Sequence, residues 1–321
     1  MLATDAPPSS FLRVPARAGA GRMRSRGDRV FRLLTLAAAL VLPALVAAIG
    51  VQLWEASRLA RERFGVGFLW HETWNPVASQ FGALPFLYGT VVSSAIALAL
   101  AGPAGVVVAI YLAEMAPSWI SRPLGTLVEL LAAVPSVVYG LWGVFVLIPW
   151  LRAWVEVPVS LHLSRVPLLA GPVYGPGLLA AGVVLAIMIL PTVAAISREV
   201  LLAIPGSQRD AALALGVTRW EVIRHILLPA ARRGIAGALG LGIGRALGET
   251  MAATMVIGNT ARISASLLAP GYSLPSVIAN EFTEASTPLY LSALVELGLL
   301  LFGVTLAVNV LARMLVRGAV R

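Results

Sequence analysis

The sequence contains no cysteine, and all 24 of its basic side chains are arginine, so lysine is absent as well. The absence of cysteine excludes disulfides, thiolate catalysis and cysteine-based metal sites. The absence of lysine excludes the GxxxxGK[ST] loop, because that loop uses its lysine to reach the terminal phosphates of a nucleotide. We therefore expect the chain to bind no cofactor and to be no enzyme, and we expect a separate subunit to use any ATP-Mg.

Charge of either sign is also scarce. Only 12% of the residues are charged, against about 25% in a typical soluble domain. Hydrophobic residues make up 59% of the chain and the mean hydropathy is +0.87, which excludes an ordinary globular fold. The formal charge of +9 can indicate nucleic-acid binding, but that function needs a basic face on a soluble domain. Here the arginines flank apolar segments, so membrane topology explains them better and we expect no nucleic-acid partner.

Residues typical of catalytic or metal centres are few and scattered. His71, His162 and His225 show no ligand spacing, so we expect no metal site. No paired catalytic carboxylates, and no nucleophile with an adjacent base, lie at a plausible depth in the apolar segments. These absences disfavour a membrane enzyme.

Long apolar segments dominate what is present and predict an all-helical integral membrane protein with about six spans. Each segment is long enough to cross about 30 Å of hydrocarbon as a helix. Pro135 and Gly140 interrupt the third, which can therefore consist of two shorter pieces. The predicted spans cover residues 33–53, 87–112, 124–150, 178–196, 234–257 and 291–311.

The distribution of arginine predicts the orientation. With the N-terminus inside, seventeen arginines fall on the cytoplasmic side and six on the opposite side, so we expect both termini in the cytoplasm. Residues 1–30, rich in Pro, Ala, Gly and Arg, predict a flexible basic tail, and residues 31–321 predict the membrane domain. The tail could touch anionic lipid, but a disordered topogenic leader is the favoured interpretation.

The cytoplasmic loop at 207–229 carries the most informative pattern. Ser207 with Asp210, and Thr218 with Glu221, match the capping box that starts a helix. Gly216 suits the turn between two short helices, and we expect Pro229 to end the second. The loop therefore predicts a compact helix-turn-helix suited to docking.

The same loop resembles the coupling loop of binding-protein-dependent ABC importers. That family's pattern is E-A-A, three residues, G, nine residues and I-x-L-P, and Asp210 in place of glutamate is the single departure here. The resemblance implies that the loop enters a cleft of an ATPase subunit and carries its motion into the membrane. The alternative is an ordinary amphipathic loop that only connects two spans. The residues in register with the pattern are Asp210, Ala211, Ala212, Gly216, Ile226, Leu228 and Pro229.

Further segments are similar to the permeases of the phosphate importer. They are PFLYGTVVSS (85–94), AIYLAEMAP (109–117), ELLAAVPSVVYGLWG (129–143), GRALGETMA (244–252) and ANEFTEAS (279–286). The Gly-Arg before ALGETMA and the FLW…WNP stretch at 68–76 resemble the PstC-type rather than the PstA-type subunit. The resemblance implies the MetI-like fold of type I importer permeases in a bacterial inner membrane. It also implies three partners: a PstA-type permease, a PstB-type ATPase dimer and an extracytoplasmic PstS-type phosphate-binding protein.

Two charges fall inside the fifth predicted span. Arg245 and Glu249 are four residues apart, so a continuous helix would place them on one face. Charge at bilayer depth is costly and indicates function, and a guanidinium suits two phosphate oxygens. The resemblance associates both residues with the translocation path. Because a buried cation is costly, we expect Glu249 to neutralise Arg245 when the path is empty. The alternative is a structural ion pair.

A stripe of small residues lies on the same helix. Gly240, Gly244 and Gly248 recur every four residues, which predicts close helix packing, here against the partner permease.

Three other functions stay open beside phosphate import. The first is a permease for another oxyanion, such as sulfate, molybdate or phosphonate, since one arginine does not discriminate oxyanions. The second is a secondary transporter or channel, which the coupling loop disfavours. The third is the membrane enzyme already disfavoured above.

Overall fold

The computed structural model describes residues 26–162 and 166–318 of the chain. The chain falls into two units, residues 1–49 and 50–321, which we describe separately. Within the described residues, helix is the only regular structure apart from an isolated antiparallel bridge between Asn75 and Gln80. The expected all-helical fold is confirmed.

Nineteen helical segments follow one another along the described chain. Several of them join without a break into longer helices, because the π-turns η3, η4 and η5 each lie directly between two α-helical stretches and η2 extends α3. In chain order they are α1 (Arg26–Ala56), α2 (Arg58–Phe64), η1 (Gly65–Leu69), α3 (Leu84–Ile110), η2 (Tyr111–Met115), α4 (Ser118–Ala132), α5 (Ser136–Trp142), η3 (Gly143–Leu147), α6 (Ile148–Leu151), η4 (Arg152–Glu156), α7 (Val157–His162), α8 (Leu178–Leu202), α9 (Gly206–Ala214), α10 (Arg219–Val222), η5 (Ile223–Leu227), α11 (Leu228–Gly248), α12 (Met251–Val256), α13 (Leu274–Glu281) and α14 (Pro288–Gly318).

Within the described residues, six helices, some of them single and some joined, are long and apolar enough to cross a membrane. This confirms the predicted number of spans. Their large apolar side chains stay exposed to an extent that water would not favour, as with Val107 at 64% and Phe145 at 73%. Such a surface suits contact with lipid or with another subunit. The six helices are Gly27–Ala56, Leu84–Met115, Ser136–His162, Leu178–Leu202, Arg219–Gly248 and Pro288–Met314.

The first unit consists, in its described part, of the N-terminal portion of α1. This helix begins at Arg26, so residues 26–30 of the predicted tail are helical. Residues 1–25 of that tail lie outside the described residues. From residue 27 to residue 48 the side chains of this helix are exposed, and most of them are apolar.

Prolines account for the π-turns inside the long helices. Each of the four π-turns, η2 to η5, ends two residues before a proline: Pro117, Pro149, Pro158 or Pro229. A proline in a helix lacks one N–H donor and its ring collides with the carbonyl four residues earlier. For Pro149, Pro158 and Pro229, which lie inside continuing helices, that carbonyl lies within the π-turn and the wider turn relieves the collision. Pro117 lies beyond the end of its helix, so this account does not apply to η2. The expectation that Pro229 ends its helix is therefore wrong, because η5 lets the helix continue into α11.

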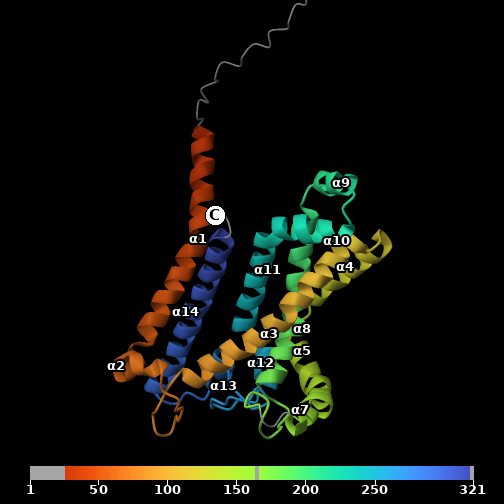
Figure 1. Ribbon diagram of the computed structural model, residues 1–321. Helices are drawn as coiled ribbons and strands as arrows, with labels where there is room; N and C mark the ends of the chain where they lie inside the picture. The colour runs from red at the N-terminus through yellow and green to blue at the C-terminus, as the bar shows by residue number, and fades with distance from the viewer. Residues whose placement is uncertain (1–25, 163–165, 319–321) are drawn as a thin grey trace, which may run out of the picture. The chain divides into compact units, whose positions relative to one another are not determined.

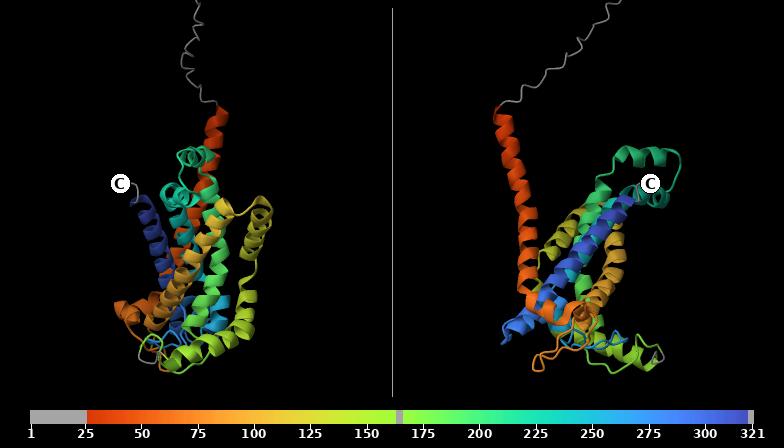
Figure 2. Two further views of the ribbon diagram at one scale, coloured as in Figure 1. Left: turned by 45° about the vertical axis from the view of Figure 1, so that its right-hand side comes forward. Right: turned by 90° about the vertical axis from the view of Figure 1, so that its left-hand side faces the viewer.

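The second unit is organised around α3 and α8, which cross closely, with α11 packed on both and α14 packed on α11 (Figures 1 and 2). Small residues permit the crossing: a Cβ at Gly105 would lie 2.9 Å from Val193, and one at Gly182 would lie 2.5 Å from Ile96. α9 and α10 lie at one end of this unit and α13 lies at the other (Figure 1). The unit therefore has two distinct ends joined by packed helices.

Two of the predicted spans are broken. The interruption expected at Pro135 is confirmed, because α4 ends at Ala132 and α5 begins at Ser136, while Gly140 lies within α5 without breaking it. The fifth predicted span, 234–257, is not one helix as expected. α11 ends at Gly248, and α12 begins only at Met251.

We predict that Gly89→Ala destabilises the purified protein by about 1–3 kcal/mol through overpacking. Gly89 lies in the first two turns of α3, and a Cβ there would collide with the backbone carbonyl of Tyr272. Gly237→Ala is the matched control, since this helical glycine has open space around it and alanine favours helix. Thermal unfolding in one detergent measures both variants, and equal midpoints for the two would contradict the packing described here.

Candidate functional site

The two helix breaks lie against each other. A Cβ at Gly140 in α5 would lie 3.1 Å from the Cα atom of Ala252 and 2.6 Å from the Sδ atom of Met255, both in α12. The glycine therefore lets α5 rest on the backbone of α12. The ends of α4 and α11, which precede the breaks, meet through Arg245.

Arg245 lies in the last turn of α11, partly exposed, and makes only long contacts. Its Nη1 lies 3.5 Å from Thr192 Oγ1, midway along α8, and its Nη2 lies 3.5 Å from the carbonyl oxygen of Ala132, the last residue of α4. Both distances are at the outer limit of a hydrogen bond, and both acceptors are neutral. Among the described residues no carboxylate pairs with this guanidinium.

Glu249 does not occupy the position that the helical spacing predicts. It follows the last residue of α11 with an extended backbone, φ −71° and ψ 123°, and its Oε1 accepts a hydrogen bond from the N–H of Ala252 at 3.2 Å. It thus satisfies a free donor in the first turn of α12. The expected shared helical face with Arg245 is wrong, because the helix ends between the two residues.

The glycine stripe packs within the chain. A Cβ at Gly240 would lie 3.0 Å from the Cβ of Ala312, and one at Gly244 would lie 3.7 Å from Asn309, both on α14. Gly248 has open space around it. At Gly240 the close contact is therefore made by α14 of the same chain.

The loop at 207–229 is a helix-turn-helix, as expected. Gly216 has φ +82°, the left-handed conformation that glycine adopts without strain, and it follows α9. The second capping box is confirmed: Thr218 Oγ1 accepts from the Glu221 N–H at 3.4 Å, and Glu221 Oε2 accepts from the Thr218 N–H at 2.8 Å. The first is wrong, since α9 begins at Gly206, before Ser207, and no side chain caps it.

The motif residues of this loop divide between the core and the surface. Ala212 is buried, and Ile226 and Leu228 are partly buried, so these positions hold the loop on the membrane helices. Asp210, Ala211, Gly216 and Pro229 are exposed. Exposed apolar side chains that the motif does not include accompany them: Leu213 at 44%, Leu215 at 84% and Trp220 at 60%.

Arg209 is the residue of this loop that the sequence pattern missed. Its Nε lies 3.1 Å from each carboxylate oxygen of Glu114, and its Nη2 lies 2.7 Å from Glu114 Oε1. Its Nη1 donates to the carbonyl of Ile204 and its Nη2 to that of Leu201, each at 2.8 Å. The guanidinium therefore joins α9 to η2, which continues α3, to the last turn of α8 at Leu201, and to Ile204 just after that helix. No local signal could reveal this, because Glu114 is 95 residues away.

An all-helical membrane unit with broken spans and a helix-turn-helix at one end is the architecture of an ABC importer permease. The solved structure of the MetNI methionine ABC transporter, described as inward facing, matches the fold. Its TM-score is 0.51 at 22% identity, covering 75% of this chain and 95% of that chain.

Sequence comparison gives the family. The sequence model of the binding-protein-dependent transport system inner membrane component matches residues 105–321. The phosphate transport system permease protein PstC of Mesorhizobium japonicum is 46% identical over 290 residues, 89% of each chain. That of Xylella fastidiosa strain 9a5c is 47% identical over 296 residues, 91% of each chain. The chain belongs to this inner membrane component family and, within it, to the PstC permeases, which confirms the resemblance found in the coupling loop.

We predict that Glu114→Gln loosens α9. The ion pair is mostly shielded, with side-chain exposures of 20% and 12%, so losing its charge should cost about 2 kcal/mol of local stability. That corresponds to a roughly 30-fold rise in amide hydrogen exchange over residues 206–216. The matched control is Glu199→Gln, whose carboxylate is 70% exposed and 3.8 Å from Arg198. Unchanged exchange in Glu114→Gln would show that the pair does not hold the loop.

Proposed function

We propose that the chain is the membrane permease of an ATP-driven importer of inorganic phosphate. In this proposal it forms half of the translocation path, with a second, PstA-type permease forming the other half. A PstB-type ATPase dimer supplies the energy and a PstS-type protein delivers phosphate from outside. The relatives named as PstC proteins support the substrate, because this chain matches about nine-tenths of their length.

The observation that carries the proposal is that no carboxylate of the described residues pairs with the positive charge of Arg245. All three nitrogens of Arg209 have close acceptors, one of them a carboxylate, whereas Arg245 has only two neutral acceptors at 3.5 Å. A partly exposed guanidinium at the depth of a helix break keeps donors in the fork geometry that matches two phosphate oxygens. The site can therefore hold a phosphate transiently, and the weak resting contacts cost little to replace.

Glu249 has a different part in this proposal from the one that the sequence suggested. Its carboxylate is held by the first turn of α12, so it does not neutralise Arg245 at rest. A negative charge just beyond the arginine opposes the onward movement of an anion. It therefore keeps phosphate binding weak enough for release toward either side.

The loop around α9 supports coupling to a separate ATPase. Leu213 and Leu215 expose apolar surface outside the spans, Trp220 does so at the start of the helix Arg219–Gly248, and Asp210 adds an exposed carboxylate in the same loop. Such a surface fits the cleft of a partner subunit. In this proposal the loop and both termini face the cytoplasm, in keeping with the distribution of arginine, and the partner hydrolyses ATP-Mg because this chain lacks a phosphate-binding lysine.

Arg245→Gln should lower ATP-driven uptake of labelled phosphate roughly 10- to 150-fold, the range that a lost hydrogen bond to a charged group gives. Uptake is measured in vesicles containing the complete reconstituted complex. Arg58→Gln is the matched control, because Arg58 is 67% exposed and pairs with Glu62. Normal uptake in Arg245→Gln would remove the arginine from the path. Uptake of sulfate or molybdate in place of phosphate by the unaltered complex would refute the substrate.

Leu215→Glu should abolish co-purification of the ATPase subunit, because it places a charge on the most exposed apolar side chain of the loop. Ser118→Glu adds the same charge at the exposed first residue of α4, where the helix dipole favours it, and should leave the association intact. Quantitative pull-down with tagged permease compares the two. A complex that survives Leu215→Glu would place the ATPase contact elsewhere.

A further inference from the structure

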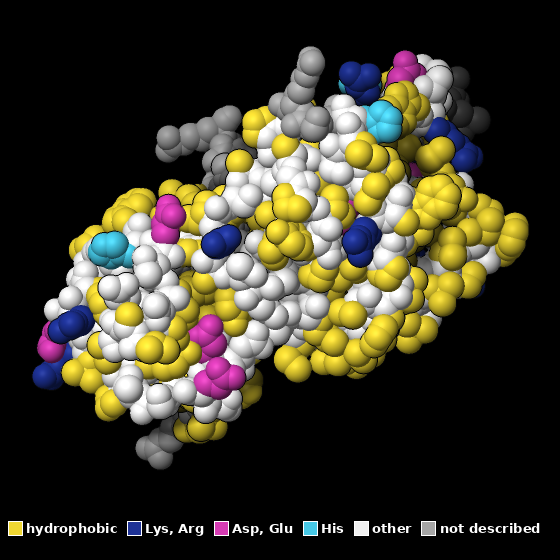
Figure 3. Space-filling view, turned by 90° about the horizontal axis from the view of Figure 1, so that it is seen from below, with side chains coloured by type: hydrophobic (Ala, Val, Ile, Leu, Met, Phe, Trp, Pro, Cys, Tyr) yellow, Lys and Arg dark blue, Asp and Glu magenta, His cyan; other side chains and the backbone are white. Residues whose placement is uncertain are grey.

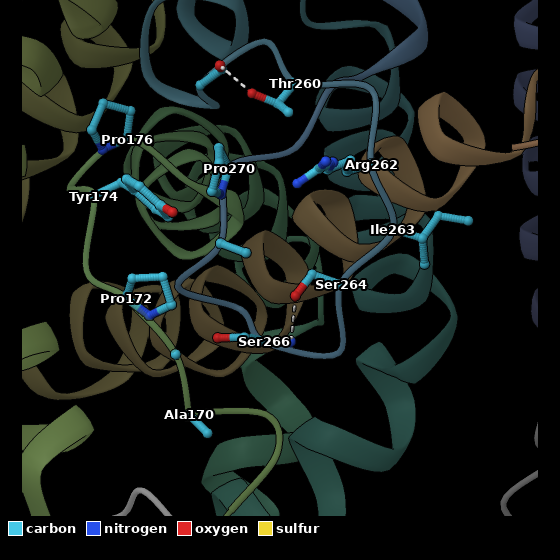
Figure 4. A pocket seen from close by; sticks show the side chains of 13 residues that line it. Ala170, Pro172, Tyr174, Pro176, Thr260, Arg262, Ile263, Ser264, Ser266 and Pro270 are labelled. Atoms are coloured by element: carbon cyan, nitrogen blue, oxygen red, sulfur yellow. Dashed lines mark hydrogen bonds between the residues drawn. The ribbon is translucent and has the colours of Figure 1, made fainter. Parts of the chain in front are cut away.

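A cavity lies at the end of the second unit opposite α9. Two loop segments enclose it, residues 170–176 before α8 and residues 258–270 after α12, and its volume is about 730 Å³. Small-molecule sites commonly measure about 300–1,000 Å³. Figure 4 shows its walls, with Tyr174 and Arg262 extending toward each other from the two segments.

The lining suits an anion. Arg262 is exposed, and its side chain makes no ion pair or hydrogen bond with the rest of the described chain. Among the described residues no aspartate or glutamate lines the cavity, while the hydroxyls of Ser264, Ser266 and Tyr174 do; the hydroxyl of Thr260 donates to the carbonyl of Gly258 at 3.1 Å. Seen from this end of the molecule, charged side chains are dispersed rather than gathered into one patch (Figure 3). The field inside the cavity is therefore set by Arg262 and is positive.

Hydrogen bonds fix the second segment in place. Leu267 donates at 2.8 Å to the carbonyl of Leu168, two residues before the first segment, and its own carbonyl accepts from Leu179 at 2.8 Å. Tyr88, in the first turns of α3, donates through its hydroxyl to the carbonyl of Ser264 at 2.6 Å. This wall is therefore preformed, which lowers the cost of binding a small ligand.

The position of the cavity connects it with Arg245. Gly258, in its wall, is the second residue after the end of α12 at Val256. The other end of α12 adjoins the break at Glu249. Six helical residues at about 1.5 Å each make α12 about 9 Å long. An anion held near Arg262 is therefore one short helix away from the break beside which Arg245 lies.

From this we infer that the cavity is a second oxyanion site, which receives phosphate through Arg262 and the surrounding hydroxyls before it reaches Arg245. The inference rests on the proposed function for the identity of the anion, but not for the existence of an anion site. Its role is capture: phosphate exchanges there with the outside solution or a delivering protein, and the positive cavity raises its local concentration at the outer end of α12.

The native absence of cysteine permits a direct test by charge-selective labelling of the complete complex in nanodiscs. Ser264→Cys places one thiol in the cavity, and its rates of reaction with sulfonatoethyl and trimethylammonioethyl methanethiosulfonate are compared. Val77→Cys, a 98% exposed position in the loop between the bridged residues Asn75 and Gln80, gives the reference ratio. We expect the anionic reagent to be favoured about fivefold over that reference, since a fixed charge concentrates opposite ions. Arg262→Gln in the same background should abolish the preference.

Protection by ligand completes the test. Inorganic phosphate should slow labelling of Ser264→Cys, while chloride at equal ionic strength should not. The inference is overturned by equal protection from both salts, by a labelling ratio equal to the reference, or by protection only from a ligand-free binding protein, which would make the cavity a protein contact. Protection by sulfate or molybdate but not phosphate would support the oxyanion site and count against phosphate as substrate. If Ser264→Cys does not fold, Ile263→Cys labels the same cavity.

Discussion

A helix that crosses hydrocarbon has no water to satisfy its backbone N–H and C=O groups, so it can break only where other protein groups replace the lost bonds. Two predicted spans of the second unit are interrupted, at residues 133–135, just before the helix Ser136–His162, and at residues 249–250, just after the helix Arg219–Gly248. Glu249 satisfies a donor of α12, and Arg245 approaches the last carbonyl of α4. The groups that the proposed path uses are thus the groups that the breaks require.

Two arginines illustrate how surroundings decide what one side chain does. Arg209 and Arg245 are both partly exposed, but Arg209 has a carboxylate and two carbonyls within 3.1 Å. The guanidinium of Arg209 is therefore fixed. Removing one of these partners would leave a largely shielded donor without its hydrogen bond. Arg245 has no such partners, so a mobile anion can complete its coordination. The first arginine therefore holds a structural connection, whereas the second is the one that the proposed function assigns to the transported anion.

Sequence reasoning found what depends on local pattern and missed what depends on distant contacts. Hydropathy gave six spans, Pro135 marked a break, and Thr218 with Glu221 marked a helix start, because each depends on neighbouring residues. The predicted position of Glu249 was wrong because the sequence from Gly244 to Ala252 does not by itself predict where the helix ends. The packing of α5 on α12 accommodates that helix end. Arg209 was missed because its partner Glu114 lies on another span. The prediction that Pro229 ends its helix was wrong because a π-turn can accommodate a proline within a continuing helix.

The division between continuous and broken spans suggests where movement would occur. α3 and η2 form one helix from Tyr88, which bonds the wall of the outer cavity, to Glu114, which holds Arg209, a length of about 39 Å at 1.5 Å per residue. α3 and α8 are packed too closely to slide independently, as the contact at Gly105 requires. A displacement of α9 passed through Arg209 would therefore move both helices together. The relative movement would fall on the breaks, where fewer helical hydrogen bonds oppose it, and Arg245 lies beside them.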